Sequence, residues 1–349
     1  MLRPLTFSIL SSLALTLSAQ ESGDVFKKYE PEVRKAVDLG LDFLLTQEKG
    51  SGGFEGTHGI STGISSLVGM AFLSTGATPG NGRYGEAILR RLDYVLKNIQ
   101  KDGVISCGDH GNGPMYAHNI SALFISECSG MVDLERQKKI DTALAKAIKI
   151  ILDAQAVKKD ERQQGGWRYQ PNSNDSDMSC SGWALMALKS ARLNGAAVPT
   201  AAIESAVKYV MNMRDEKNGN IGYTSSDANK DSLTGAGLLC LELCGRHLAP
   251  ENLLAADWIL ANHTKLPQAE FAFYGNYYNA QGMFQMGGKY WKTYAEWMYS
   301  TYLPVQKADG SWEGERFGPT YSTCMMVLAM TVPFRQLPIY QRDEHVDEE

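Results

Sequence analysis

The sequence predicts an all-α protein, an (α/α)6 toroid in which six helical hairpins close into a ring. Three observations lead to this fold class. A unit of two helices recurs along the chain, and no segment alternates polar and apolar residues with a period of two. The first helix of each unit carries one charged face. The second helix is almost uncharged around its circumference, so it suits the interior while the first helix suits the surface.

The repeating unit consists of an amphipathic helix, a glycine-rich loop and a second helix of smaller residues. Units begin at Leu41, Leu92, Ile150 and Val207, a degenerate fifth unit comprises residues 251–263 and 275–288, and the sixth begins at Tyr299. A glutamine marks the same position in four of the units: Gln47, Gln100, Gln155 and Gln306. The first three are about 50 residues apart, a spacing typical of helical-pair repeats.

The two kinds of helix are expected to occupy different rings. Residues 32–47, 84–100 and 201–214 place apolar side chains at i, i+3, i+4 and i+7 opposite charged ones, as in helices that cover a core. Residues 61–76 and 231–245 are rich in Gly, Ala, Ser and Met, and we expect them to form an inner barrel. An open solenoid would need polar capping repeats and a polar concave face, so the apolar inner helices favour closure.

The two ends of the chain are expected to lie outside the toroid. Residues 1–19 contain Arg3, an apolar segment from Leu5 to Leu17 and small residues up to Ala19, which is the layout of a secretory signal peptide. We expect cleavage near Ala19, export to the periplasm or the medium, and no integral membrane segment in the mature protein. Residues 20–29 are expected to be a linker, 30–338 the single toroid domain, and 339–349 an acidic disordered tail.

Composition bears on partners and on disulfides. The formal net charge is -5 and no Lys/Arg cluster is denser than an ordinary helix face, so we expect no nucleic acid partner. Six cysteines in an exported chain permit disulfide bonds. Four of them, Cys180, Cys240, Cys244 and Cys324, stand in apolar helical runs, where a buried free thiol is the commoner state.

The loop between the two helices carries a motif with a family resemblance. Gln155 is followed by Gly165, Gly166 and Trp167, Gln306 by Asp309, Gly310, Ser311 and Trp312, and Gln47 by Gly52, Gly53 and Phe54. This pattern resembles the prenyltransferase and squalene oxidase repeat, including the Gln-Trp motif of triterpene cyclases such as the squalene cyclase C-terminal domain. The resemblance implies a terpenoid cyclase or protein prenyltransferase-like toroid. It does not imply one activity, because this toroid serves cyclases, prenyltransferases, thioester domains and binding proteins.

If all hairpins run out and back in the same sense, the inner helices start around one mouth of the barrel. Side chains near these starts are expected to line a cavity that binds an apolar or ring-shaped small molecule. The candidate lining residues are Tyr116, His118, Asn119, Cys180, Trp183, Asp231, Tyr278, Gln281 and Tyr321. Most polar residues at these starts are also good helix caps, and the aromatic ones could equally fill the barrel. No cofactor and no metal is expected.

Two enzymatic alternatives and a structural one stay open. Asp175 and Asp177 resemble the aspartate cluster with which triterpene cyclases protonate an isoprenoid double bond, although Met178 holds the place of its last aspartate. That resemblance implies Asp177 as the acid and Asp175 as its supporter. A zinc prenyltransferase is disfavoured, because Asp177 and Cys180 are three residues apart instead of two and His118 precedes them. A structural or protein-docking toroid would have a filled barrel and an apolar outer patch.

Overall fold

The computed structural model describes residues 7–107, 111–314 and 316–340, with the side chains of the first helix from residue 25 onward. This part of the chain forms twelve α-helices and a two-stranded hairpin, β1 (Glu55–Gly56) and β2 (Gly59–Ile60). The helices are α1 (Phe7–Thr46), α2 (Thr62–Leu73), α3 (Gly85–Lys97), α4 (Met115–Glu127), α5 (Leu134–Ala156), α6 (Met178–Leu193), α7 (Thr200–Asn212), α8 (Lys230–Leu243), α9 (Pro250–Asn262), α10 (Ala272–Met286), α11 (Gly288–Tyr302) and α12 (Gly318–Met330). Three short 3₁₀ helices, η1 (His263–Gln268), η2 (Val332–Phe334) and η3 (Pro338–Tyr340), complete these elements.

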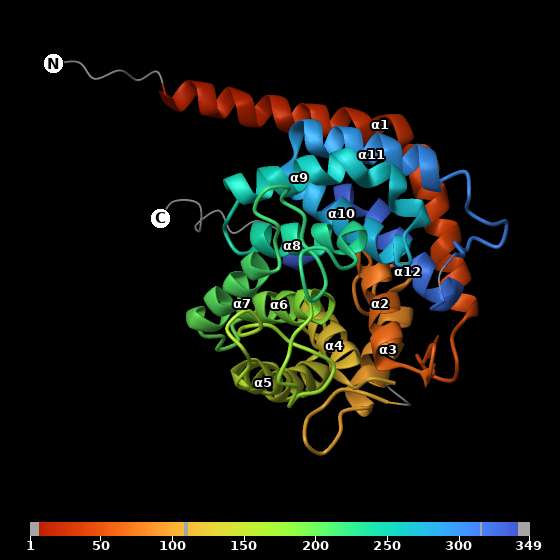
Figure 1. Cartoon of the computed structure of the whole chain (residues 1–349). Helices are drawn as coiled ribbons and strands as arrows, with labels where there is room; N and C mark the ends of the chain where they lie inside the picture. The colour runs from red at the N-terminus through yellow and green to blue at the C-terminus, as the bar shows by residue number, and fades with distance from the viewer. Residues whose placement is uncertain (1–6, 108–110, 315, 341–349) are drawn as a thin grey trace.

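Even-numbered helices form an inner barrel and odd-numbered helices surround it, which confirms the predicted all-α toroid (Figure 1). Around the barrel, α2 packs on α4, α4 on α6, α6 on α8, α8 on α10, α10 on α12, and α12 again on α2. The inner helices are buried on nearly all sides. In α4, Tyr116 is the single residue that is not buried. The outer helix α3 instead exposes a charged face, as its sequence predicts.

The ring closes through contacts between its last and first hairpins. Thr331 follows α12 and donates from its Oγ1 to Ser74 Oγ after α2, at 2.8 Å. Gln306 Nε2 donates to the carbonyl of Ala36 in α1 at 2.8 Å. The ends of α2 and α12 therefore meet, so these two inner helices run in the same direction. Residues from the first turns of all six inner helices lie around one mouth of the barrel.

The repeated loop has the same bonding in two units. Gln155 Nε2 donates to the carbonyl of Gly165 at 2.9 Å and to that of Ala202, in the next outer helix, at 2.8 Å. Trp167 Nε1 donates back to the carbonyl of Ile151 at 2.7 Å. Each loop of this type therefore ties its own hairpin to the neighbouring one.

In the sixth unit the corresponding groups make the same bonds. Gln306 Nε2 donates to the carbonyl of Gly310 at 2.9 Å in addition to Ala36, and Trp312 Nε1 donates to the carbonyl of Tyr302 at 2.8 Å. Gln47 differs, because its Nε2 donates to Thr46 Oγ1 beside it. The tryptophans of this motif are thus packing residues between repeats.

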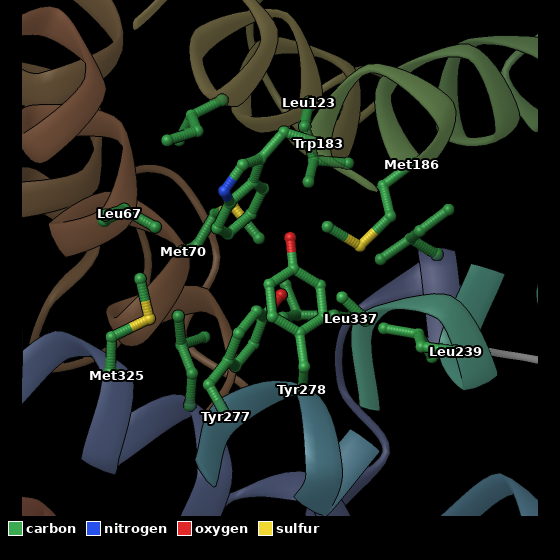
Figure 2. Packing of buried hydrophobic residues seen from close by; sticks show 14 of the residues in the cluster. Leu67, Met70, Leu123, Trp183, Met186, Leu239, Tyr277, Tyr278, Met325 and Leu337 are labelled. Carbon is green, nitrogen blue, oxygen red and sulfur yellow. The ribbon is translucent and has the colours of Figure 1, made fainter. Parts of the chain in front are cut away.

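Large side chains fill the barrel toward the C-terminal ends of the inner helices. Trp183 of α6 stacks on Tyr277 of α10 with ring centroids 5.6 Å apart, and Tyr278 meets the same indole edge-on at 5.5 Å (Figure 2). The 3₁₀ helix η3 closes the far end, where Ile339 N donates to Glu127 Oε2 at 3.2 Å and Gln285 Nε2 to the Tyr340 carbonyl at 2.7 Å. The barrel interior is therefore plugged from Trp183 to η3.

The folded body extends past the predicted limits at both ends. Residues 20–29, expected to be a linker, lie within α1, and Val25 is buried while Phe26 contacts Phe334 edge-on at 5.6 Å. Ile339 and Tyr340, expected to begin the tail, are packed against the barrel because they are apolar enough to cover its open end. The remaining tail residues 341–349 and residues 1–6 of the predicted signal peptide lie outside the described residues.

All six cysteines have free thiols. Among the described residues, none of the helices combines the length and the apolar character needed to cross a membrane.

Candidate functional site

A cavity of about 620 Å³ opens at the mouth where the inner helices begin. All six inner helices contribute to it from their first turns. The lining comprises Ser61, Gly63, Ile64 and Leu67 at α2, Tyr116, Ala117 and Ile120 of α4, Ser179 and Trp183 of α6, Ser232 and Leu233 of α8, Tyr274 of α10, and Tyr321 and Met325 of α12. This volume is within the range of small-molecule sites. The toroid is thus hollow at the mouth and filled below it.

Aromatic rings dominate the walls of the cavity. Tyr116 stacks on Tyr169 with ring centroids 5.9 Å apart, and Phe317 packs on Tyr321 at 5.0 Å. Trp183, only 1% exposed, reaches the cavity from the plugged part of the barrel and forms its floor. Such walls suit an apolar or planar ligand.

The rim carries one pair of opposite charges. Arg316 Nη1 lies 3.7 Å from Glu270 Oε1, and both side chains are exposed. The guanidinium also stacks on the rings of Phe271 and Phe317, at 5.3 and 5.1 Å from their centroids. Because solvent screens this ion pair, it contributes little to folding stability. Both residues stand at the opening of the cavity.

Asp177 caps the N-terminus of α6 and is buried in the wall behind the cavity. Its Oδ1 accepts from Cys180 N at 2.8 Å and from Ser179 Oγ at 2.5 Å. Its Oδ2 lies 3.6 Å from Arg168 Nε and accepts no hydrogen bond. Burial raises the pKa of Asp177 to about 6, against the opposing effect of these hydrogen bonds and of Arg168.

Asp175 lies on the outer side of the same loop. Its side chain is 53% exposed, and its Oδ2 contacts Arg168 Nη1 at 3.4 Å. Arg168 thus stands beside both aspartates. The contacts of Asp177 are with Ser179, Cys180 and Arg168, so the described hydrogen bonds supply it with no second carboxyl group.

Three of the predicted lining residues, Tyr116, Trp183 and Tyr321, face the cavity. Two more lie immediately behind it. The Cys180 thiol donates to the carbonyl of Arg168 at 3.1 Å, and Asn119 Nδ2 lies 3.7 Å from that sulfur. Both side chains are used in packing α4 against α6.

His118 points away from the cavity, toward the outer ring. Its Nδ1 accepts from Ile105 N at 3.0 Å, and its Nε2 lies 3.2 Å from the carbonyl of Ala147 in α5. Complete burial lowers the pKa of His118 to about 4. Both ring nitrogens are therefore occupied by backbone groups, which leaves no lone pair for zinc. No group of three metal-ligating side chains occurs within the described ranges.

The remaining predicted residues sit at other depths. Tyr278 belongs to the plug beneath Trp183, Gln281 Nε2 donates to the carbonyl of Leu328 deep in the barrel at 3.3 Å, and Asp231 is exposed. Tyr278 and Gln281 lie deeper in the barrel than predicted because α10 begins earlier than predicted. The fifth inner helix was expected to begin at Gly275, whereas α10 begins at Ala272, so these two residues lie further along the helix.

The same shift explains a residue that sequence reasoning missed. Tyr274, one turn before Tyr278, lines the cavity together with Ser179 and Ser232. Tyr169 and Tyr223 reach the wall from loops, and their hydroxyl groups are hydrogen-bonded to each other. An aromatic residue directly before the expected helix start was the available signal for Tyr274. The loop tyrosines had none, because loop conformation is not periodic.

No protein-family model and no curated protein matches the sequence. Solved structures do match the fold. The type II terpene cyclase MstE from Scytonema, without ligand, has a TM-score of 0.55 at 16% identity, over 88% of this chain and 99% of that one. A single-residue variant of that enzyme, with its substrate geranylgeranyl dihydroxybenzoate, gives a TM-score of 0.54 at 12% identity, over 88% of this chain and 98% of that one. A mutant reducing-end-xylose releasing exo-oligoxylanase with xylobiose gives 0.60 at 14%, over 91% and 97%.

These neighbours establish a terpenoid cyclase-like α/α toroid fold for the chain. They perform different chemistry on different substrates, so the shared fold by itself assigns no reaction.

Proposed function

We propose that this protein is an exported binding protein whose mouth cavity takes an apolar or ring-bearing small molecule. The single observation that supports this is the cavity of about 620 Å³ walled by aromatic and aliphatic side chains from all six inner helices. Trp183 and Met325 make its floor apolar, and the tyrosines offer polar groups that orient a ligand. A toroid with a purely structural role would have little reason to keep this volume open.

The cavity is poorly suited to the hydrolysis of a saccharide. Glycoside hydrolysis generally uses two carboxyl groups that flank the scissile bond. Among the described lining residues, Glu270 is the single carboxylate, and it stands at the rim beside Arg316. An isoprenoid chain, which needs apolar contact area above all, fits these walls better.

Binding is testable through Trp183, since it forms the cavity floor. The protein is titrated with geranylgeranyl dihydroxybenzoate and, separately, with xylobiose, while tryptophan fluorescence is recorded. We expect a saturable change with the first compound and none with the second. The Trp183→Phe variant should lose most of that change while a direct binding assay, equilibrium dialysis, still detects the ligand. Binding of xylobiose alone, or of neither compound, would overturn the proposal.

Acid-initiated cyclisation or isomerisation is the second candidate function. It is favoured by one observation: Asp177 is a buried carboxyl group beside Ser179 of the cavity wall, and burial raises its pKa to about 6. In this scheme Asp177 is the proton donor and Asp175 acts at a distance through Arg168. Asp177→Asn keeps the oxygen that caps α6 but removes the acid. Turnover of an isoprenoid by the wild type that survives in Asp177→Asn would exclude this role, and Asp175→Asn is the matched control.

Export is part of the proposal and rests on the N-terminal pattern of Arg3, the apolar run to Leu17 and Ala19. N-terminal sequencing of protein recovered from a periplasmic or culture fraction should give a chain that begins at residue 20. An intact Met1 in a cytoplasmic fraction would contradict it.

A further inference from the structure

Two tyrosine hydroxyl groups of the cavity wall converge on Ser179. The Tyr116 hydroxyl donates to Ser179 Oγ, and the Tyr274 hydroxyl donates to the Ser179 backbone carbonyl at 3.1 Å. Ser179 Oγ in turn donates to Asp177 Oδ1 at 2.5 Å. All three residues that carry these hydroxyls line the cavity, and they come from α4, α10 and α6.

Each hydroxyl group has one proton to donate, and these protons are already used inside the wall. A fourth lining hydroxyl, Ser232 Oγ, donates to the carbonyl of Asn229 at 3.1 Å. Toward a ligand, the oxygen atoms of these four side chains can therefore act only as acceptors. Turning the hydroxyl group of Tyr116, Ser179 or Tyr274 round to donate to a ligand would break one of the hydrogen bonds within the wall, which is costly.

The direction of donation is held by Asp177. Its Oδ1 accepts from Cys180 N as well as from Ser179, so that oxygen is committed as an acceptor. A proton taken up by this carboxyl group goes to Oδ2, which accepts no hydrogen bond. The order Tyr116 to Ser179 to Asp177 is thus the same in both states of the carboxyl group. A chain of donations that ends on a carboxylate also strengthens the acceptor at its far end, Tyr116.

Other lining groups can donate to a ligand, among them the side chains of Asn112 and Asn229. Tyr169 and Tyr223 share one of their two hydroxyl protons between them, so one remains for a ligand. The guanidinium of Arg316 is paired with Glu270 at the rim. At Ser179, by contrast, the three converging hydroxyl groups present acceptors to a ligand.

We infer that the cavity selects ligands whose apolar body carries a hydrogen-bond donor. The oxygen atoms of Tyr116, Ser179 and Tyr274 accept the hydrogen bond from that donor. This inference rests on the proposed binding function and narrows its ligand class. The donor is a hydroxyl or an ammonium group, because both present protons to these oxygen atoms. An ether or an ester at the same position would place acceptor against acceptor.

Three probes with the same apolar chain test this: geranylgeraniol, geranylgeranylamine and geranylgeranyl methyl ether. The methyl ether keeps the oxygen and loses the proton. Titrations followed by tryptophan fluorescence should show the alcohol and the amine binding about 10- to 100-fold more tightly than the ether, since the ether leaves buried acceptors unpaired. The tighter binder of the alcohol and the amine shows whether the cavity prefers a hydroxyl or an ammonium group as the donor.

The double variant Tyr116→Phe with Tyr274→Phe removes both tyrosine acceptors and keeps the rings. It should bring the ratio of alcohol to ether affinity down by at least about fivefold. Tyr169→Phe is the matched control and should leave that ratio within a factor of about three. In this variant the hydroxyl group of Tyr223 still has a proton to donate. Thermal melting by circular dichroism establishes that both variants fold.

The outcomes separate this inference from the proposed function. Equal binding of alcohol and ether by the wild type would refute the acceptor surface and leave the binding cavity standing. Failure of all three probes to bind would refute both. Since the comparison of probes uses the wild type, misfolding of the double variant does not decide the result.

Discussion

Replacement of Gln306 by methionine should weaken the seam at which the toroid closes. The Gln306 amide joins the last hairpin to the first, since its Nε2 donates to the carbonyl of Ala36 in α1 and to that of Gly310 in its own loop, at 2.8 and 2.9 Å. Methionine has a similar length and flexibility but no donor. Gln306→Met therefore removes two hydrogen bonds without creating a large void.

The expected loss follows from those two bonds. A hydrogen bond within a protein contributes about 0.5–1.5 kcal/mol net, so the variant should be less stable by about 1–3 kcal/mol. Urea unfolding followed by circular dichroism measures this as a lower midpoint. Hydrogen exchange should locate it, with faster exchange in α1 around Ala36 than in α7. Gln155→Met, which breaks the corresponding pair of bonds to Gly165 and Ala202, should cost a similar amount and act on α7 instead.

Gln47 provides the matched control. It occupies the corresponding place in the sequence, but its amide donates only to the neighbouring Thr46 hydroxyl. Gln47→Met should change stability by less than about 0.5 kcal/mol. An equal loss at Gln47 and Gln306, or an unchanged midpoint for Gln306→Met, would refute the claim that this amide closes the ring.

Three further changes have defined outcomes. Burial raises the pKa of Glu127 from its ordinary value of 4.5 to about 7, so the folded state favours the protonated form. The resulting stability, about 3 kcal/mol, is fully present below pH 4.5 and is lost as the pH rises from there through about 7. Glu127→Gln should remove that part of the pH dependence of the urea midpoint, and identical pH profiles would contradict it. Ile64→Trp fills the cavity mouth and should abolish the fluorescence response to geranylgeranyl dihydroxybenzoate, whereas Leu193→Trp on the exposed surface should preserve it; retained binding in Ile64→Trp would place the ligand elsewhere. Gly310→Ala should cost about 3 kcal/mol or more, because φ is +90° and a Cβ atom would overlap the Leu39 carbonyl. Gly318→Ala, at φ +83° with open space around it, should cost only about 1–2 kcal/mol, and equal midpoints would show that the overlap is relieved.

The helical framework was predictable from local patterns. The charged face of α3 and the uncharged circumference of α4 follow from their residues alone, and they assign one helix to the outside and the other to the inside. The boundaries were less accurate. Residues 20–29 continue α1 despite Gly23, and Val25 and Phe26 of this stretch pack on the folded body. Ile339 and Tyr340 fold back because the far end of the barrel offers apolar surface to cover.

The candidate site was predictable in its location and only partly in its members. Caps at the starts of the inner helices pointed to one mouth, and a cavity lies there. Within α4, however, Tyr116 faces the cavity while His118, two residues later, faces the outer ring, where Ile105 and Ala147 occupy its nitrogens. A rotation of two residues on a helix turns a side chain to the opposite side, so proximity in sequence did not decide which residues line the cavity.

By itself, the sequence determined that this chain is helical, that its hairpins repeat, and which helix of each hairpin is buried, because these properties depend on periodicity and charge within single segments. Tertiary structure alone decided how each inner helix is rotated about its axis. An inner helix is almost uncharged around its circumference, so its own residues favour no orientation. Contacts with two barrel neighbours and an outer helix set that orientation, and with it the depth of the cavity, the position of Trp183 as its floor, and the direction in which the hydroxyl groups around Ser179 donate.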